Sequence, residues 1–391
     1  MKKTYDVVVL GLGAMGSASA LALARRGAKV CGVEQFGMAH DRGSSHGETR
    51  IIRKAYFEHP DYVPLLLRSY DLWQELCDET GTNLLTLCGL VLSGDPASTT
   101  VSGLLRCYDE HQLPHERWSA ETARHHFPRI AFPENHTVFF DPDGGFLHAE
   151  RSIMTMLEQS RRLGAELLFE TQVHSWKSDA SGVELTLGNG TTLHAHKLVV
   201  TAGAWTGRLL AHLHLPVEIW RRVLLWYGAA NWQDYSPGAC PVFYFETEEG
   251  GFYGFPALDS DGVKIGEHTL PEPCAAPEHV DRTLRPEDAH HFDAFVRQTF
   301  PALTPDISRH AICMYTLSPD HHFIIDQSPE QENVVFAAGF SGHGFKFAPV
   351  IGELLAGLAM EQRSDLPWEF LSLQRFREDR PDSTATTPDS T

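Results

Sequence analysis

The chain has 391 residues, which is too long for one small hydrophobic core, so one large composite domain or two domains are expected. Its residues are 42% hydrophobic and 21% charged, as in an ordinary soluble globular protein, and it contains no apolar run long enough to predict a membrane span or a signal peptide. The formal net charge of −19 argues against binding to nucleic acid or to an anionic membrane.

The cysteines and histidines argue against a disulfide framework and against a metal site. The seven cysteines are odd in number and include no CxxC pair, as expected in a reducing cytoplasm. The 22 histidines include adjacent pairs, but none has the spacing of a zinc site. The sequence therefore predicts a cytoplasmic protein without a metal.

The clearest motif lies at the N-terminal end. Residues 5–10 form a β-branched apolar run, and Gly11, Gly13 and Gly16 follow it at the start of a segment in which Ala and Leu recur with helical spacing. Gly11 permits a tight turn, Gly13 lets the backbone approach a pyrophosphate, and Gly16 lets the helix pack closely against the strand. The pattern predicts a strand, a turn and a helix that bind a dinucleotide.

A second buried strand is expected at residues 28–33. It ends at Glu34, where a carboxylate would accept hydrogen bonds from a ribose. The polar loop at 37–53 has too little apolar content to pack alone, so we expect it to lie along a bound group. It places Arg50 and Arg53 near the cofactor region.

The middle of the chain predicts helices at 62–77 and 149–163 and strands at 84–92 and 138–140. Three strands at 166–173, 183–187 and 191–193 are expected to form a β-meander. A separate buried strand at 197–201 follows and runs into a turn of small residues that includes Gly203. Because FAD-binding Rossmann domains need such a late strand beside the dinucleotide and nicotinamide-binding domains do not, flavin is favoured.

Residues 215–325 alternate in the manner of an antiparallel sheet, interrupted by a helix at 286–300. Tyr253, Lys264 and His268 lie on its successive strands. A further apolar strand at 333–338 then ends in a Gly-rich turn, and a helix is expected at 348–360. The positive end of that helix and Lys346 in the turn could stabilise a reduced, anionic ring.

These elements predict a mixed α/β fold in which an FAD-binding Rossmann-type domain carries a second, antiparallel-sheet domain for the substrate. The first domain is expected at 1–80, 145–215 and 325–375, and the second at 81–144 and 216–324. The polar residues 378–391 are expected to be a disordered tail.

Several motifs in matching order resemble the monomeric sarcosine oxidase family of flavoproteins, which includes N-methyltryptophan and pipecolate oxidases. The motifs are GLGAMG, GSSHGETRIIR, FYGFP, KIGEH, CMYTLSPDHHFIID and AAGFSGHGFKF, and the resemblance runs from about Tyr5 to about residue 375. It implies a monomeric FAD enzyme whose flavin is tethered through the cysteine of CMYT, which is Cys313. From its surroundings alone, Cys313 reads as an ordinary buried strand cysteine.

The resemblance also implies roles for individual residues. Arg53 and Lys346 match the pair that holds a substrate carboxylate, and a cation pair is suited to orienting an amino acid. Lys264 matches a lysine that promotes reaction of the reduced flavin with oxygen. The other matching positions are His46 and Arg50 against the flavin, Tyr253 and His268 at the substrate amine, Tyr244 and Tyr315 at the substrate, and Gly11, Gly13, Ala14, Met15, Gly16, Glu34, Val173, Gly203, Gly344 and Lys346 at the cofactor. Taken singly, most of these side chains have ordinary structural explanations.

The activity implied is oxidation of a secondary amine, with the protein positioning and polarising the reactants. Sarcosine would give glycine and formaldehyde, and oxygen would be reduced to hydrogen peroxide. The loop Ala55–Pro60 lacks the two glycines usual in the family, and Tyr244 stands where sarcosine oxidases have methionine. Leu225-Trp226-Tyr227 is closer to N-methyltryptophan oxidases, whereas CMYT is closer to sarcosine oxidases, so the hints conflict.

Four functions stay open at this point. The first is an oxidase of N-methyl amino acids, with sarcosine as the first choice, and the second is an oxidase of a larger or cyclic secondary amine such as N-methyltryptophan or pipecolate. The third is a nicotinamide-dependent dehydrogenase, which Glu34 permits. The fourth is a protein that uses FAD only as a structural or redox-sensing element.

Overall fold

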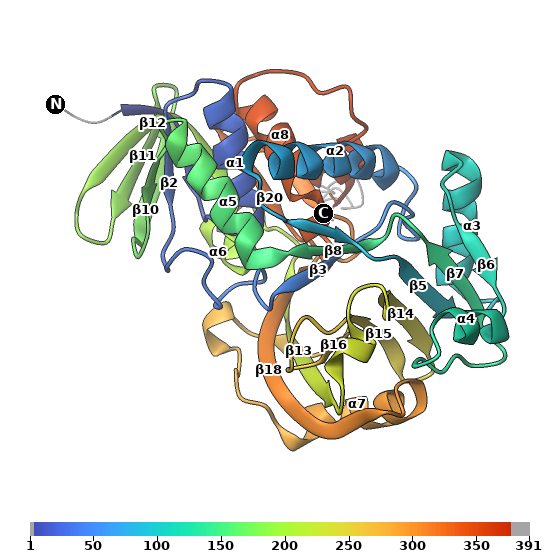
Figure 1. Cartoon of the computed structure of the whole chain (residues 1–391). Helices are drawn as coiled ribbons and strands as arrows, with labels where there is room; N and C mark the ends of the chain where they lie inside the picture. The colour runs from blue at the N-terminus through green and yellow to red at the C-terminus, as the bar shows by residue number, and fades with distance from the viewer. Residues whose placement is uncertain (1–3, 377–391) are drawn as a thin grey trace, which may run out of the picture.

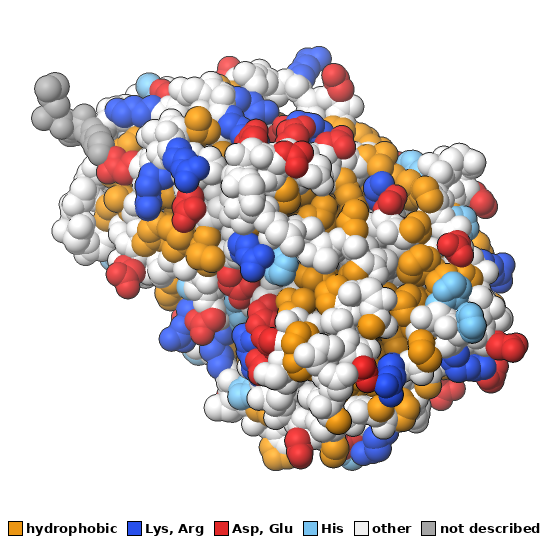
Figure 2. All heavy atoms as spheres, in the orientation of Figure 1, with side chains coloured by type: hydrophobic (Ala, Val, Ile, Leu, Met, Phe, Trp, Pro, Cys, Tyr) orange, Lys and Arg blue, Asp and Glu red, His pale blue; other side chains and the backbone are white. Residues whose placement is uncertain are grey.

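The computed structural model describes residues 4–376 and contains two large sheets, a small sheet between them, and helices that cover mainly the first large sheet (Figure 1). The predicted tail lies outside the described residues. None of the helices between residues 4 and 376 is both long and apolar enough to cross a bilayer. Charged side chains of both signs are interspersed with apolar ones over the face shown in Figure 2.

The first sheet has eight strands in the order β10-β11-β12-β1-β2-β9, with β20 on β12 and β19 on β20. Its centre, β20-β12-β1-β2-β9, is parallel, as predicted for a Rossmann-type domain. The strands are β1 (Thr4–Leu10), β2 (Val30–Val33), β9 (Glu166–Leu168), β10 (Val173–Asp179), β11 (Gly182–Leu187), β12 (Thr192–Val200), β19 (Ile324–Gln327) and β20 (Val334–Ala338).

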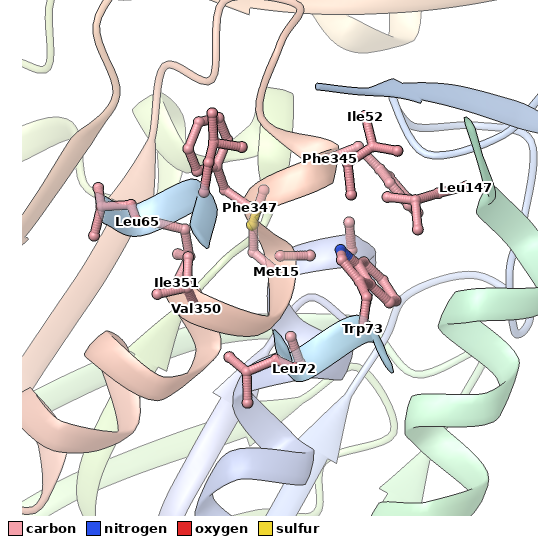
Figure 3. Packing of buried hydrophobic residues seen from close by; sticks show 14 of the residues in the cluster. Met15, Ile52, Leu65, Leu72, Trp73, Leu147, Phe345, Phe347, Val350 and Ile351 are labelled. Carbon is pink, nitrogen blue, oxygen red and sulfur yellow. The ribbon is translucent and has the colours of Figure 1, made fainter. Parts of the chain in front are cut away.

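Helix α1 (Ala14–Arg25) packs between α5 (Ala149–Arg162) and α8 (Ala348–Ala359), and α2 (Tyr62–Thr80) packs on α8. Apolar side chains from α1, α2 and α8 converge on one core, and Figure 3 shows Met15, Trp73 and Val350 as members of it. Phe345 stacks on Trp73 with the two ring planes 8° apart. This core therefore supports the Gly-rich turn before α8 from behind.

The second sheet has nine strands in the order β17-β13-β16-β15-β14-β5-β7-β6, with β18 on β13. It is not purely antiparallel as predicted, because β14 pairs with β5 in parallel. Since β5 comes from a segment far earlier in the chain, alternation within either strand could not reveal that direction. The strands are β5 (Leu90–Gly94), β6 (Glu116–Trp118), β7 (Thr137–Asp141), β13 (Glu218–Ala229), β14 (Val242–Thr247), β15 (Gly250–Phe255), β16 (Val263–Glu267), β17 (Pro273–Cys274) and β18 (Leu303–Leu317).

The small sheet joins β3 (Thr49–Ile52), β8 (Gly145–His148) and β4 (Leu85–Leu87). Two predictions fail here. The loop predicted at 37–53 ends in β3, and the single strand predicted at 84–92 is two strands in different sheets. Gly89, with φ +78°, turns the chain between β4 and β5.

The predicted β-meander is also partly wrong. Its first strand divides at Glu170, whose φ is +51°, into β9 and β10. The amide of Glu170 donates to Phe36 and that of Thr171 donates to Glu34, which ties β9 beside β2. The strands predicted at 191–193 and 197–201 are one strand, β12. Its start pairs with β11, and its later part pairs with β20.

The helix predicted at 286–300 is confirmed as α7 (Pro286–Thr299), and a four-residue helix, α6 (Thr206–Leu209), follows the turn after β12. Helices α3 (Thr99–His111) and α4 (Ala120–His126) were not predicted. Each begins at a serine whose hydroxyl accepts a hydrogen bond from the third residue along, an N-cap signal that the sequence does carry. The predicted domain limits stay a prediction.

Candidate active site

The turn after β1 is shaped by glycine. A Cβ on Gly11, whose φ is +92°, would lie 2.7 Å from the Thr201 oxygen, and one on Gly16 would lie 1.7 Å from the Gly11 oxygen. A Cβ on Gly13 would meet only the Ser45 hydroxyl, at 3.7 Å. Gly11 and Gly16 are therefore required by packing, whereas Gly13 borders open space. The N-cap residue Gly13 has no side chain to cap α1, and the Ala14 amide makes only a long hydrogen bond, 3.4 Å, to the Ser45 hydroxyl, so the start of the helix remains accessible to an anion.

Glu34 follows β2 and is buried at the same edge of the sheet. One carboxylate oxygen accepts from the Leu12 amide at 2.8 Å, and the other accepts from the Phe36 amide at 3.0 Å. His40 Nε2 lies 3.4 Å from Glu34 Oε1. Because each carboxylate oxygen has more than one acceptor position, Glu34 is fixed in orientation and can still accept from a sugar hydroxyl.

A cavity with about 1310 Å³ of empty space opens at this edge. Every predicted cofactor residue except Gly16, Cys313 and Lys346 lines it. Gly16 acts behind the wall by allowing α1 to approach β1. The sequence analysis missed several wall residues that follow strands without belonging to a motif: Gln172, Trp205 and Arg208.

A second cavity of about 790 Å³ adjoins the first, and the two share Arg50, Tyr315, Gly342 and Phe345. It brings together eight of the predicted residues from distant segments, namely Arg50, Arg53, Tyr244, Tyr253, His268, Cys313, Tyr315 and Lys346. The predicted residues His46 and Lys264 line neither cavity. Both are buried behind the walls.

Cys313 on β18 is surrounded by groups that favour its ionised form. Arg50 Nη2 donates to its sulfur at 3.6 Å, which favours the thiolate, whereas the neutral thiol donates to the Ser44 oxygen at 3.5 Å. Burial raises the pKa of the thiol, but a hydrogen bond with His46 and the positive charge of Arg50 outweigh burial, so the pKa falls to about 7. A buried thiol that is substantially ionised at neutral pH is suited to act as a nucleophile.

Lys264 on β16 donates to the carbonyl oxygens of Gly47 at 2.7 Å and Thr49 at 2.8 Å. Its Nζ also lies 3.9 Å from the centre of the Phe255 ring. Burial and the nearby charge of Arg50 hold the pKa of this lysine well below its usual range. Lys264 therefore braces the backbone on either side of Glu48 from the opposite sheet.

Arg53 and Lys346 are two buried cations of the second cavity. Arg53 donates to both carboxylate oxygens of Glu58 at 2.8 Å and lies 4.4 Å from the ring centres of both Tyr56 and Phe57. Burial lowers the pKa of Lys346, Arg53 lowers it further and Glu58 partly opposes them, leaving that pKa at about 7. The cavity therefore holds an arginine that is already paired and a lysine that has no carboxylate within ion-pair distance among the described residues.

Helix α2 fixes the backbone of Lys346. The Ser69 hydroxyl and the Trp73 indole N–H both donate to the Lys346 carbonyl oxygen, at 2.5 and 3.0 Å. The Nζ of Lys346 donates to the His343 oxygen at 2.8 Å. The Gly-rich turn that carries Lys346 is thus held in place by a helix from the other end of the chain.

Three polar side chains form a row on the opposite wall. His268 Nδ1 lies 3.2 Å from the Tyr315 hydroxyl, which donates to the Tyr253 hydroxyl at 3.4 Å. Burial and the neighbouring His343 and Arg222 lower the pKa of His268 to about 3. His268 is therefore neutral at physiological pH.

Two titratable residues that line this cavity, Glu58 and His343, were not predicted as site residues. Glu58 was noted only as part of the entrance loop, and its pairing with Arg53 has no regular sequence spacing. His343 lies inside the motif that contains Lys346; its Nδ1 hydrogen-bonds to the Tyr56 hydroxyl, and its Nε2 lies 2.9 Å from the His321 oxygen. His343 links the entrance loop to the Gly-rich turn.

The sequence matches the family described as FAD dependent oxidoreductase over residues 6–358. The chain belongs to this family. It is 40% identical to the monomeric sarcosine oxidase of Streptomyces avermitilis, over 92% of this chain and 94% of that protein. It is 36% identical to the N-methyl-L-tryptophan oxidase of Yersinia pestis, over 95% of this chain and all of that one. Among solved structures, the amino acid oxidase NikD of nikkomycin biosynthesis superposes with a TM-score of 0.84 at 25% identity, covering 95% and 98% of the two chains.

The match to this family confirms the predicted fold class, and the sequence relatives confirm the predicted family resemblance. FAD takes the place of the nicotinamide alternative. The larger cavity fits it: the accessible start of α1, the open space at Gly13 and the Glu34 carboxylate match a pyrophosphate and a ribose.

Proposed function

We propose that this protein is an FAD-dependent oxidase of N-methyl, secondary-amine amino acids, with sarcosine as the first substrate to test. The observation that carries the proposal is the second cavity, where Arg53 and Lys346 lie on walls that adjoin the cofactor cavity. Two buried cations beside a redox cofactor are suited to hold the carboxylate of an amino acid. The sequence relatives named for secondary-amine substrates support the same class.

The carboxylate is proposed to bind Arg53 and Lys346. Because Arg53 is paired with Glu58, the incoming carboxylate competes with that side chain for the same N–H groups. Lys346 has no such partner among the described residues, so it is the readier first contact. Binding an anion also favours the protonated form of this lysine.

The amine is proposed to face His268, Tyr253 and Tyr315. These groups are neutral at physiological pH, since burial lowers the pKa of His268 and raises those of both tyrosines. They can hydrogen-bond to an uncharged amine without adding a carboxylate that would hold it protonated. Bound FAD would supply the two-electron oxidation of the amine, with oxygen as the final acceptor and hydrogen peroxide as its product.

The FAD is proposed to be tethered through Cys313, with His46 and Arg50 favouring the thiolate. The low pKa of this thiol and its place on the wall of the second cavity support the tether. Lys264 is proposed to assist the reaction with oxygen, although it reaches the site from behind the wall. A Lys264→Met variant should keep anaerobic reduction largely intact and slow reoxidation; equal slowing of both steps would remove that role.

An oxidase of a larger or cyclic secondary amine is the second candidate. Part of the cavity lining is apolar and favours an apolar substituent on the substrate. It includes Leu90, Leu92, Phe57 and Tyr244, and the ring centres of Phe57 and Tyr244 lie 6.0 Å apart.

A monomeric state and a cytoplasmic location are also proposed. Sedimentation of the purified protein tests the monomeric state.

The decisive experiment is peroxide release with sarcosine, N-methyltryptophan, pipecolate and unmethylated glycine. Sarcosine should be oxidised fastest, and preference for a bulky amine would favour the second candidate. No peroxide from any of them would favour a non-catalytic FAD protein. Acid precipitation tests the tether separately: flavin colour should stay in the wild-type pellet and leave with the supernatant in Cys313→Ser.

A further inference from the structure

The loop of residues 44–50, here the His46 loop, contains an unfavourable backbone conformation. Gly47 has φ +91° and Glu48 has φ +68°, so two successive residues are left-handed and the second carries a Cβ. A glycine adopts this conformation readily, but a glutamate does so only where its surroundings compensate. The contacts around Glu48 must therefore compensate for its unfavourable backbone conformation.

Three groups make those contacts: Lys264 donates to the Gly47 and Thr49 oxygens, Arg309 pairs with the Glu48 carboxylate, and Glu150, in the first turn of α5, binds the backbone N–H groups. Its Oε1 accepts from the Gly47 amide at 2.6 Å, and both its oxygens accept from the Glu48 amide, at 3.2 and 3.1 Å. The Ala149 amide donates to the Glu48 oxygen at 2.7 Å. One carboxylate thus binds two successive N–H groups, which the left-handed conformation of Gly47 and Glu48 turns to the same side.

The His46 loop in turn fixes Arg50. The guanidinium donates to the carbonyl oxygens of Ser44, His46 and Thr49, at 2.8, 2.5 and 2.8 Å. Its Nη2 reaches the Cys313 sulfur. Because three acceptors belong to the loop backbone, a change at Gly47 or Glu48 would move the guanidinium away from the thiol.

We propose that Glu150 is a positioning residue for attachment of the flavin to Cys313, acting by holding the His46 loop against the thiol. The inference rests on the tether in the proposed function. Glu150 lines neither cavity, so it acts through the loop. In the attachment the sulfur replaces one hydrogen of the ring's 8α-methyl group: a C–H bond breaks and a C–S bond forms. Two electrons and two protons pass through the ring to O₂, which becomes hydrogen peroxide.

The negative charge of Glu150, taken alone, predicts that its removal would speed the reaction of the Cys313 thiol rather than slow it. The carboxylate of Glu150 is negative, so neutralising it without moving the loop would favour the thiolate. The titratable and charged groups that act on Cys313 come from the loop, β16 and the segment before α7: His46, Arg50, Lys264 and Arg282. Tyr253 and Tyr315 also face it and stay neutral. Slower reaction of the thiol after loss of Glu150 is therefore a sign of lost positioning.

The test uses wild type, Glu150→Gln and Glu150→Asp, with Glu121→Gln as a matched control because Glu121 is an exposed first-turn acid of α4. Each protein is prepared from riboflavin-starved cells. The rate of alkylation of Cys313 at neutral pH is followed by peptide mass spectrometry, and acid-stable flavin is followed after FAD is added.

In Glu150→Gln, alkylation should slow at least threefold and attachment at least tenfold, while FAD still binds reversibly. Glu150→Asp should show a smaller loss, and Glu121→Gln should match wild type. Alkylation in Glu150→Gln as fast as in wild type, or faster, would overturn the proposal. If Glu150→Gln does not fold, the proposal is overturned when Cys313 in Glu150→Asp is alkylated as fast as in wild type. If wild type never gains acid-stable flavin, the tether is wrong, and the alkylation rates still decide whether Glu150 positions the loop.

Discussion

The cofactor cavity and the substrate cavity adjoin, but they are built in different ways. The first is walled largely by backbone and small residues at the carboxyl ends of β1, β12 and β20, and its main acid is Glu34. The second is walled by large side chains from the small sheet, the second sheet and the turn before α8. A wall made of backbone tolerates little change in local conformation, whereas a wall made of side chains can change its chemistry without changing the fold.

The two cavities also differ in charge. Arg50, Arg53 and Lys346 line the substrate cavity together with one carboxylate, Glu58. Arg50 and Arg53 come from one motif, and folding brings Lys346 to them from the turn before α8. Substitutions in the first cavity should therefore affect FAD retention, and those of Arg53 and Lys346 in the second should affect catalysis alone.

The largest effect is expected from Gly16→Ala. Its Cβ would lie 1.7 Å from the Gly11 oxygen, so strand and helix must separate, at about 3 kcal/mol of unfolding free energy or more. Gly13→Ala is the matched control from the same motif, since its Cβ meets only a hydroxyl at 3.7 Å. It should fold but retain less FAD. Thermal unfolding and flavin content measure both, and equal melting temperatures for the two variants would contradict the distinction.

Arg53→Ala should lower kcat/KM about 100-fold, since a charge-assisted contact to the carboxylate is worth about 1.5–3 kcal/mol. Flavin content should not change. The variant also leaves Glu58 unpaired, so Arg53→Ala with Glu58→Gln separates lost attraction from new repulsion. Steady-state kinetics with sarcosine measure both, and an unchanged kcat/KM in the single variant would remove Arg53 from the carboxylate site.

Binding of a small unreactive carboxylate such as acetate should weaken as the pH rises above 7. The pKa of Lys346 is about 7 in the free site, and a bound anion raises it, so binding takes up a proton. Affinity is then highest below pH 7 and falls by up to about tenfold per pH unit above it. Titration of flavin absorbance measures this, and Lys346→Met should remove the dependence; a dependence that survives the substitution belongs to another group.

The smallest effect on activity is expected at Asp141, which lines neither cavity. Burial raises the pKa of this carboxyl from its ordinary value of 3.8 to about 6. The folded state thus binds the proton more tightly than the unfolded state, and the stability contributed by this group falls as the pH rises from about 4 to 6. Asp141→Asn should gain about 2–3 kcal/mol relative to wild type between pH 4 and 7. Chemical unfolding at several pH values measures it, with flavin content as the control.

The difference between the cavities also explains which features were predictable. The Gly11–Gly16 turn, the strand ending at Glu34 and the turn at 339–344 each lie within a short segment, and their chemistry follows from backbone conformation. The parallel pairing of β5 with β14 and the division of residues 84–92 between two sheets depend on partners far away in the chain. Alternation of apolar residues contains no information about those partners.

The amino-acid sequence by itself determined the strand-turn-helix of a dinucleotide site and the resemblance to amine-oxidising flavoproteins, and it named Arg53, Lys346 and Cys313 as candidate site residues. Only the tertiary structure showed that Glu58 pairs with Arg53, that Lys264 lies buried behind the cavity wall, and that Glu150 binds the backbone of the His46 loop. The physical reason is the separation along the chain of the residues that interact. Backbone conformation is set by neighbours in the chain, whereas charge pairing and burial are set by residues that folding brings together.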